Sequence, residues 1–269
     1  MRKIAIYDSF TEPKHRRLID ETAARAGFTV DYYAAPAIVP ADKRGDYEVI
    51  YGMPKPGELK DFVNLKWFCG SFAGVDAYLD DSLYPSPEVM LSNSSGAYGV
   101  TIAEHMVMVT LMLLRHAPVY CADQAAGRWG RVLPMRSIMG STITVVGTGD
   151  IGTEFARRAK AMGAAAVRGV RRTKKAADPA FDEIHTNDEL DALNHDRLAG
   201  AALDVFEQEP IPAGDPAWTA KNLLITPHIS GQMSLGYTRD RNVQLFCEDL
   251  ERYGRGEKPL RLVNRRIGY

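Results

Sequence analysis

One stretch of the sequence, from Thr142 to Gly163, restricts the fold more than any other. The β-branched residues TITVV run directly into GTGDIG, and an amphipathic segment that ends at Gly163 follows. An apolar β-branched run favours a buried strand, and the periodicity after the glycines favours a helix. The stretch therefore predicts a strand, a tight glycine turn and a helix, the repeating unit of a parallel α/β domain.

The glycine spacing in this turn matches the G-x-G-x-x-G pattern that binds the diphosphate of a dinucleotide. Gly147 permits the tight turn, Gly149 lets the backbone approach the diphosphate, and Gly152 lets the helix and strand pack closely. The helix N-terminus then faces the phosphates with its N–H groups and partial positive charge. The predicted cofactor contacts are the residues of the turn: Gly147, Thr148, Gly149, Asp150, Ile151 and Gly152.

The end of the next apolar run, AAAVRGV, bears on the choice between NAD and NADP. An NAD site places an acidic residue there, where it holds the ribose hydroxyls. Here Arg171 and Arg172 follow the run, and the first carboxylate is Asp178. Because an arginine in this place can bind a 2′-phosphate, Arg171 and Arg172 are predicted cofactor contacts, and NADP is favoured over NAD. A solvated basic corner is the alternative.

The N-terminal part of the chain predicts a second α/β domain. Short apolar runs at 3–7, 29–33, 48–51 and 67–69 alternate with helical or turn-rich segments, which is typical of parallel strands with crossover helices. A long helix then runs from Ala97 to His116. This helix is apolar on nearly every face, so all of its faces must be buried, either against a second subunit or within one domain.

The expected fold is therefore α/β, with two Rossmann-like or flavodoxin-like parallel-sheet domains. Residues 1–96 with 241–269 are expected to form the substrate domain, and residues 97–240 the dinucleotide-binding domain.

Composition and charge exclude several classes of partner. The 269 residues are 45% hydrophobic and 25% charged, with a formal net charge of -1, so no overall field favours nucleic acid or an anionic membrane. The most apolar run, from Val100, is interrupted by Glu104 and His105 and is shorter than the ~20 residues of a membrane span. A small metabolite is the expected partner, and no membrane segment is expected.

The three cysteines, Cys69, Cys121 and Cys247, are widely spaced and have no metal-site pattern with histidine. We expect reduced, packed thiols and a cytoplasmic protein, and no metal site is predicted.

Two further motifs carry a family resemblance. The stretches AGAALDVFEQEP and NLLITPHISG, together with SFAGVDAYLD, NSSGAYGVTIAEHMV and VVGTGDIG, resemble the D-isomer-specific 2-hydroxyacid dehydrogenases over nearly the whole chain. The resemblance implies a hydride transfer between NAD(P)H and a small 2-keto or D-2-hydroxy acid. It also implies a homodimer, which we expect to form through the helical region 97–118.

The resemblance also assigns roles to residues. His228 matches the catalytic acid/base, and Glu209 matches the carboxylate that pairs with it, since a neighbouring carboxylate stabilises the charged imidazole. Asp204 stands where the family holds the nicotinamide carboxamide. The amides around four loop residues are expected to bind the substrate carboxylate, because small residues let a backbone approach an anion: Ser71, Ala73, Gly74 and Val75.

The chain departs from the family between Val170 and Ala201. One strand-plus-helix unit takes roughly 30 residues, and the resemblance implies two to three such units where residues 171–200 stand. This interval holds a short edge strand, FDEIH, and one helix, NDELDALNHDRLAG, so an internal deletion near Leu193 and an incomplete sheet are predicted. The family's catalytic arginine belongs to the missing part, and no arginine is assigned to that role.

Three explanations of the short interval stay open: a deletion form, a sequence from which residues were omitted, or a degenerate relative. The first functional hypothesis is an NADP-preferring 2-hydroxyacid dehydrogenase, with NAD as the alternative cofactor. The second is a dinucleotide-binding module without turnover, since the catalytic arginine is absent.

Overall fold

The computed structural model describes residues 2–8, 10–34, 39–172, 178–186, 201–220 and 223–268. The chain divides into two compact units. The first unit is Met1–Tyr98 with Met233–Tyr269, and the second is Gly99–Gln232. The α/β fold class expected from the sequence is confirmed, because every named strand pairs in parallel with its neighbours.

The first unit is built on one five-stranded parallel sheet in the order β2-β1-β3-β4-β5. This order is that of the flavodoxin-like folds, in which ligands bind outside the carboxyl ends of the strands. The strands are β1 (Arg2–Asp8), β2 (Phe28–Ala34), β3 (Tyr47–Gly52), β4 (Trp67–Gly70) and β5 (Met90–Ser92).

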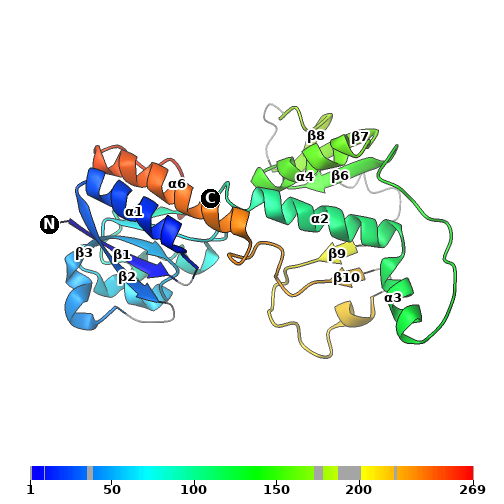
Figure 1. Ribbon diagram of the computed structural model, residues 1–269, viewed down its shortest axis with the longest axis horizontal. Coiled ribbons are helices and arrows are strands. Elements are labelled where there is room, and N and C mark those ends of the chain that lie inside the picture. Colours follow the sequence, from blue (N-terminus) through cyan, green and yellow to red (C-terminus); the bar gives the residue numbers. More distant parts are fainter. Residues whose placement is uncertain are drawn as a thin grey trace. The chain divides into compact units, whose positions relative to one another are not determined.

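Helices α1 (Pro13–Arg25) and α6 (Gly236–Gly254) lie together on one face of this sheet (Figure 1). Their apolar stripe, which includes Ile19, Phe246 and Leu250, packs on Ile4 and Ile6 of β1, and all five side chains are nearly or fully buried. The opposite face is covered by loops and by the short helices η1 (Ala41–Asp46), η2 (Pro56–Asp61), η3 (Asp76–Tyr78) and η4 (Asp81–Leu83).

The second unit begins with α2 (Gly99–Leu114) and α3 (Ala117–Ala125) and contains a three-stranded parallel sheet in the order β6-β7-β8. Its strands are β6 (Thr142–Val146), β7 (Ala166–Arg171) and β8 (Glu183–Thr186), and α4 (Asp150–Ala161) connects the first two. Phe155 and Ala159 of α4 are buried with Val145 of β6 and Val167 of β7, which fixes the helix on the sheet (Figure 1).

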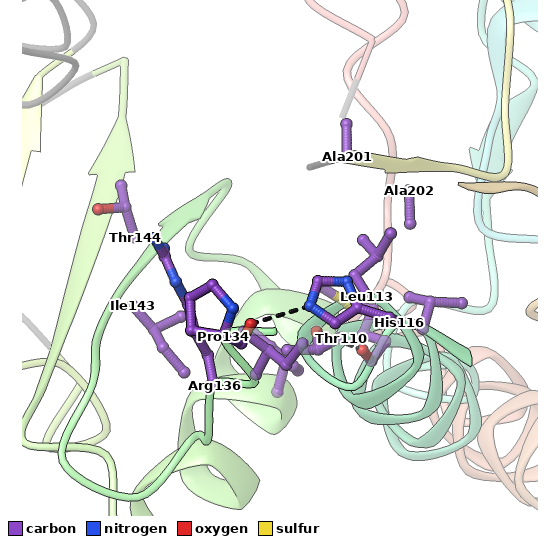
Figure 2. A pocket seen from close by; sticks show the side chains of 13 residues that line it. Thr110, Leu113, His116, Pro134, Arg136, Ile143, Thr144, Ala201 and Ala202 are labelled. Carbon is purple, nitrogen blue, oxygen red and sulfur yellow. Dashed lines mark hydrogen bonds between the residues drawn. The ribbon is translucent and has the colours of Figure 1, made fainter. Parts of the chain in front are cut away.

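The remaining strands of this unit, β9 (Ala201–Leu203) and β10 (Leu223–Ile225), form a separate two-stranded sheet, and η6 (Pro216–Thr219) lies between them in the chain. Among the described residues, β6 pairs only with β7 and β9 only with β10, so one edge of each strand has no ladder partner. A cavity of about 500 Å³ separates the two edges. Figure 2 shows Ile143 and Thr144 on one side of it and Ala201 and Ala202 on the other.

Several details differ from the sequence expectations. Strand β5 and helices α3 and α6 were not predicted, and residues 233–240 belong to the first unit because α6 begins at Gly236. Cys69 and Cys247 are buried as expected, but Cys121 on α3 is exposed, so its predicted packing was wrong. The helix predicted over NDELDALNHDRLAG and the seam near Leu193 lie outside the described residues.

Within the described residues, no single helix is both long enough and apolar enough to cross a membrane. Helices α2 and α3 meet that test only as a pair, bent by 69°.

The first prediction concerns two glycines at the start of α4. A Cβ added at Gly152 would lie 1.9 Å from the Gly147 carbonyl oxygen, whereas a Cβ at Gly149 would meet no atom within 4 Å. We expect Gly152→Ala to lower the free energy of unfolding by about 3 kcal/mol, because the backbone atoms that it strikes cannot move aside. Gly149→Ala, the matched control, should cost less than about 1 kcal/mol. Denaturant unfolding measures both, and equal losses would contradict this packing.

Candidate active site

The glycine turn joins the end of β6 to the start of α4. Gly147 has φ +95°, a backbone conformation that favours glycine, and its N–H donates to the carbonyl oxygen of Val170 at 2.9 Å. This bond ties the turn to the end of β7. Gly149 is the N-cap of α4, so the turn delivers the chain directly into the first helical residues.

The space beside Gly149 suits a bound anion. A Cβ at this position would meet no protein atom within 4 Å, so the backbone is open on that side. The N–H groups of a helix's first turn point away from the helix body and carry partial positive charge. The residues present therefore fit a dinucleotide diphosphate, which this geometry would hold through the backbone at the start of α4.

The side chains of the turn are engaged in packing. A Cβ at Gly169 of β7 would lie 2.5 Å from the Thr148 Cγ2 methyl, so Gly169 makes room for the turn. A Cβ at Gly99 would lie 2.6 Å from the Asp150 carboxylate, which therefore sits against the first residue of α2. Neither Gly169 nor Gly99 was identified from the sequence. A glycine inside the apolar run AVRGVR is the signal that could have pointed to the first.

Arg171 and Arg172 follow the carboxyl end of β7, the strand next to the glycine turn. Arg171 is the last residue of β7, and Val170 before it accepts the hydrogen bond from Gly147. The two arginines thus come directly after the residue to which the turn is bound. The structure brings the predicted diphosphate contacts and the predicted 2′-phosphate contacts to neighbouring strand ends.

His228 and Glu209 form a direct pair. The His228 Nδ1 atom lies 2.7 Å from Glu209 Oε2, and Glu209 Oε1 accepts a hydrogen bond from the Phe206 N–H at 2.8 Å. The hydrogen bond with His228, aided by the one from Phe206, lowers the pKa of Glu209. The His228 side chain is 63% exposed, and among the described residues its Nε2 atom has no hydrogen-bond partner. The pair can therefore offer a proton from Nε2 while Glu209 stabilises the charged ring.

Asp204, one residue beyond β9, lies at the base of the turn that carries His228. Its carboxylate accepts hydrogen bonds from the Thr226 hydroxyl at 2.6 Å and from the Ile229 and Ser230 N–H groups, each at 3.0 Å. Partial burial acts to raise the pKa of Asp204, but the hydrogen bonds from Ser230, Thr226 and Ile229 outweigh it and lower the pKa to about 2. The carboxylate is thus charged and held at neutral pH.

The predicted substrate loop lies in the first unit, between β4 and η3. The Ser71 N–H donates to the Gly52 carbonyl at 3.1 Å, so this amide is not available to an anion as the sequence suggested. Among the described residues, the N–H groups of Ala73, Gly74 and Val75 have no protein acceptor. The Asn93 side chain donates to the Ala73 carbonyl at 2.7 Å and holds the loop in shape.

The acid/base pair has no arginine among its described partners. Within the described part of the chain, the hydrogen bonds and ion pairs of His228 and Glu209 are to each other and to backbone or amide groups. Arg136 lines the cavity beside β6 rather than the pair, together with His116, whose Nε2 bonds to the Pro134 carbonyl (Figure 2).

A known family model matches most of the second unit. Residues 107–191 and 182–230 match the NAD binding domain of the D-isomer specific 2-hydroxyacid dehydrogenases, which confirms the resemblance found in the sequence. The two matched segments overlap at residues 182–191, so the match to the family model is not continuous there.

Individual relatives agree with this match. The chain is 42% identical to a glyoxylate reductase of Korarchaeum cryptofilum over 76 residues, which are 28% of this chain but only 22% of that enzyme. It is 37% identical over 89 residues to glyoxylate/hydroxypyruvate reductase A of an Enterobacter species, 32% of this chain and 27% of that enzyme. The chain therefore matches about a quarter of the length of these curated relatives.

Solved structures resemble the chain over its full length. A D-isomer specific 2-hydroxyacid dehydrogenase of Xanthobacter autotrophicus, in complex with NADPH, has a TM-score of 0.76 at 23% identity and covers 99% of both chains. An NADPH-dependent glyoxylate/hydroxypyruvate reductase of Sinorhizobium meliloti has a TM-score of 0.75 at 21% identity and covers 100% of both. At these identities the likeness establishes the fold.

The second prediction concerns the acid titration of Asp204. Its depressed pKa means that its contribution to stability is complete above the unfolded value of about 3.9 and is lost as the pH falls through about 2. The carboxyl carbon of Asp204, followed by NMR, should titrate with a midpoint near 2. Thr226→Val removes one donor and should move the midpoint upward. A midpoint near 3.9 in both proteins would contradict the hydrogen bonds described.

Proposed function

Since residues 107–230 match the NAD binding domain of the D-isomer specific 2-hydroxyacid dehydrogenases, we propose that this chain is an NADPH-dependent reductase of small 2-keto acids. The observation that carries the proposal is the 2.7 Å pair of His228 and Glu209, in the same unit as the glycine turn. The imidazole of this pair is exposed, and its Nε2 has no partner among the described residues. The names of the curated relatives, glyoxylate and hydroxypyruvate reductases, support the class of substrate.

In this mechanism, NADPH, when bound, would supply a hydride for the keto carbon. The backbone at the start of α4 would hold the diphosphate, as the open side of Gly149 allows. His228 Nε2 donates a proton to the carbonyl oxygen, which completes the hydroxyl group of the product. Glu209 stabilises the charged imidazole before the transfer and fixes the ring through Nδ1 during it.

The substrate carboxylate would bind to the loop of the first unit. The N–H groups of Ala73, Gly74 and Val75, which have no acceptor among the described residues, are the donors for it. A Cβ at Gly74 would meet no atom within 4 Å, so a small anion can approach the backbone there. The family resemblance assigns Asp204 to the nicotinamide carboxamide. In the structure, the Asp204 carboxylate already accepts three hydrogen bonds from the turn around His228.

We propose that the protein works as a homodimer through the region of α2 and α3. Helix α2 buries only Gly99, Thr101, Ala103 and Val109 within the single chain, while Met108 is 46% exposed. Apolar side chains of α3 and the segment after it are also exposed: Val119, Trp129, Leu133, Met135 and Met139. Exposed apolar side chains support an interface where they gather into one patch, and a homodimer would cover these. The free thiols of the three cysteines support a reducing, cytoplasmic setting.

A second candidate function is dinucleotide binding without turnover. It is favoured by one observation: among the described residues, no arginine lies with the His228–Glu209 pair. A guanidinium that holds the substrate carboxylate and polarises the keto group is not easily replaced by another residue. This candidate keeps the glycine turn and the arginines after β7 in their cofactor roles.

The third prediction separates the two candidates. The protein mixed with NADPH and glyoxylate, hydroxypyruvate or pyruvate should oxidise NADPH, followed by its absorbance. His228→Gln should slow this oxidation by about 10²- to 10⁴-fold, because it removes the proton donor. His185→Gln, which alters another partly exposed histidine of the second unit, should leave it unchanged. NADPH binding without oxidation of any substrate would favour the second candidate, and absence of binding would contradict both.

The fourth prediction concerns cofactor choice. Replacing Arg171 and Arg172 together by alanine should weaken NADPH binding by about 10²- to 10⁴-fold, since each bond from an arginine to a phosphate contributes roughly 1.5–3 kcal/mol. NADH binding should change little, because NADH has no 2′-phosphate. Arg157→Ala, on α4, is the matched control, since this arginine pairs with Glu154 and Asp178 instead. Equal losses of NADPH and NADH affinity would contradict the assignment.

A further inference from the structure

The backbone at His228 adopts a conformation that must be held by its surroundings. His228 has φ +51°, in the left-handed region that residues with a side chain seldom occupy. Such a residue persists where neighbouring contacts determine its conformation, and it is then often part of a functional site. The contacts that hold His228 can be identified from the hydrogen bonds on either side of it.

Asp204 provides these contacts on both sides of His228. Its main-chain carbonyl accepts the His228 N–H at 2.9 Å. Its carboxylate Oδ1 accepts the N–H of Ile229, the residue after His228, and Oδ2 accepts the N–H of Ser230. The same Oδ1 accepts the hydroxyl of Thr226, two residues before His228. One aspartate therefore fixes the chain from Thr226 to Ser230 around the imidazole.

The hydrogen-bond chain extends to α2. His105 Nε2 lies 3.2 Å from the Thr226 hydroxyl oxygen. A hydroxyl has one hydrogen, and here it is directed at the Asp204 carboxylate, which can only accept. The Thr226 oxygen must therefore accept from His105, so His105 carries a proton on Nε2. This contact gives a role to His105, a polar residue that interrupts the apolar sequence of α2.

We propose that Asp204 is a positioning residue, supported by Thr226 and His105, which holds His228 in its left-handed conformation and so sets the direction in which Nε2 offers its proton. The effect of Asp204 on catalysis rests on the proposed reductase function. The hydrogen bonds of Asp204 to the turn around His228 do not depend on that function. Asp204 acts through the backbone of His228, whereas Glu209 acts through its ring. The carboxylates of Asp204 and Glu209 thus both contribute to the position of the His228 imidazole.

The test starts with the protein free of cofactor, because the hold on the turn exists without it. In histidine-labelled protein, NMR should find His228 with a proton on Nδ1 that is protected by the bond to Glu209, and His105 with a proton on Nε2. Asp204→Asn leaves an amide nitrogen where a carboxylate oxygen now accepts an N–H. It should shift or broaden the His228 ring signals and expose the Nδ1 proton to exchange with water. Thr226→Val, a milder change, should shift them less and remove the His105 contact.

Asp215→Asn is the matched control. Asp215 also accepts a backbone N–H, that of Ala217 at the start of η6, in the same unit. The Asp215→Asn variant should leave the NMR signals of the His228 ring unchanged. Unchanged His228 signals in both Asp204→Asn and Thr226→Val would overturn the proposal, and Thr226→Val keeps the test available if the first variant is too unstable to study.

A kinetic measurement connects the proposal to the reaction. For a wild-type protein that oxidises NADPH, Asp204→Asn should lower kcat about tenfold or more, as misplacement of a catalytic group does, while the Kd for NADPH stays within about twofold. An increase in that Kd with unchanged kcat and unchanged His228 signals would assign Asp204 to the cofactor and overturn the proposal. If the wild type shows no turnover, the proposed function fails, and the NMR result alone decides the role of Asp204.

Discussion

The close approach of Gly152 to the Gly147 carbonyl is the contact on which the nucleotide-binding arrangement depends. No side chain fits between these residues, since a Cβ at Gly152 would lie 1.9 Å from that oxygen. Only this spacing lets α4 start directly at the end of β6 and pack Phe155 and Ala159 on the sheet. The open side of Gly149 and the helix N-terminus follow from it, and with them the capacity to hold a diphosphate.

The acid/base pair belongs to a second, equally local arrangement. His228, Glu209 and Asp204 all lie between Leu203 of β9 and the end of the second unit, and the bonds among them close within a short stretch of chain. The described hydrogen bonds of the pair thus all come from residues 204–232. The edges of β6 and β9 face a cavity of about 500 Å³ instead of a neighbouring strand, and the catalytic arginine expected from the family has no counterpart beside the pair among the described residues.

The sequence predicted those features that depend on local pattern. Strand β6 has its predicted bounds, the FDEIH run forms an edge strand, and the pairing of His228 with Glu209 follows from the motifs. Features that depend on tertiary closure were not predictable. The engagement of the Ser71 amide by Gly52 requires β3 and β4 to be paired, and the bonds of Asp204 require the turn after β10 to fold back on β9. Helix α3 was missed although Pro118, in its first turn, is a residue that favours the start of a helix.

The central claim is that a dinucleotide binds to the backbone at the start of α4. Hydrogen–deuterium exchange with and without NADPH tests it most directly, because it reports on those amides without requiring turnover. The account predicts that NADPH slows exchange in the peptides that contain residues 147–153 and leaves the peptides around the cavity, such as those of Met106–Leu114, unchanged. Protection confined to the cavity, or none at the glycine turn under conditions where NADPH is bound, would contradict it.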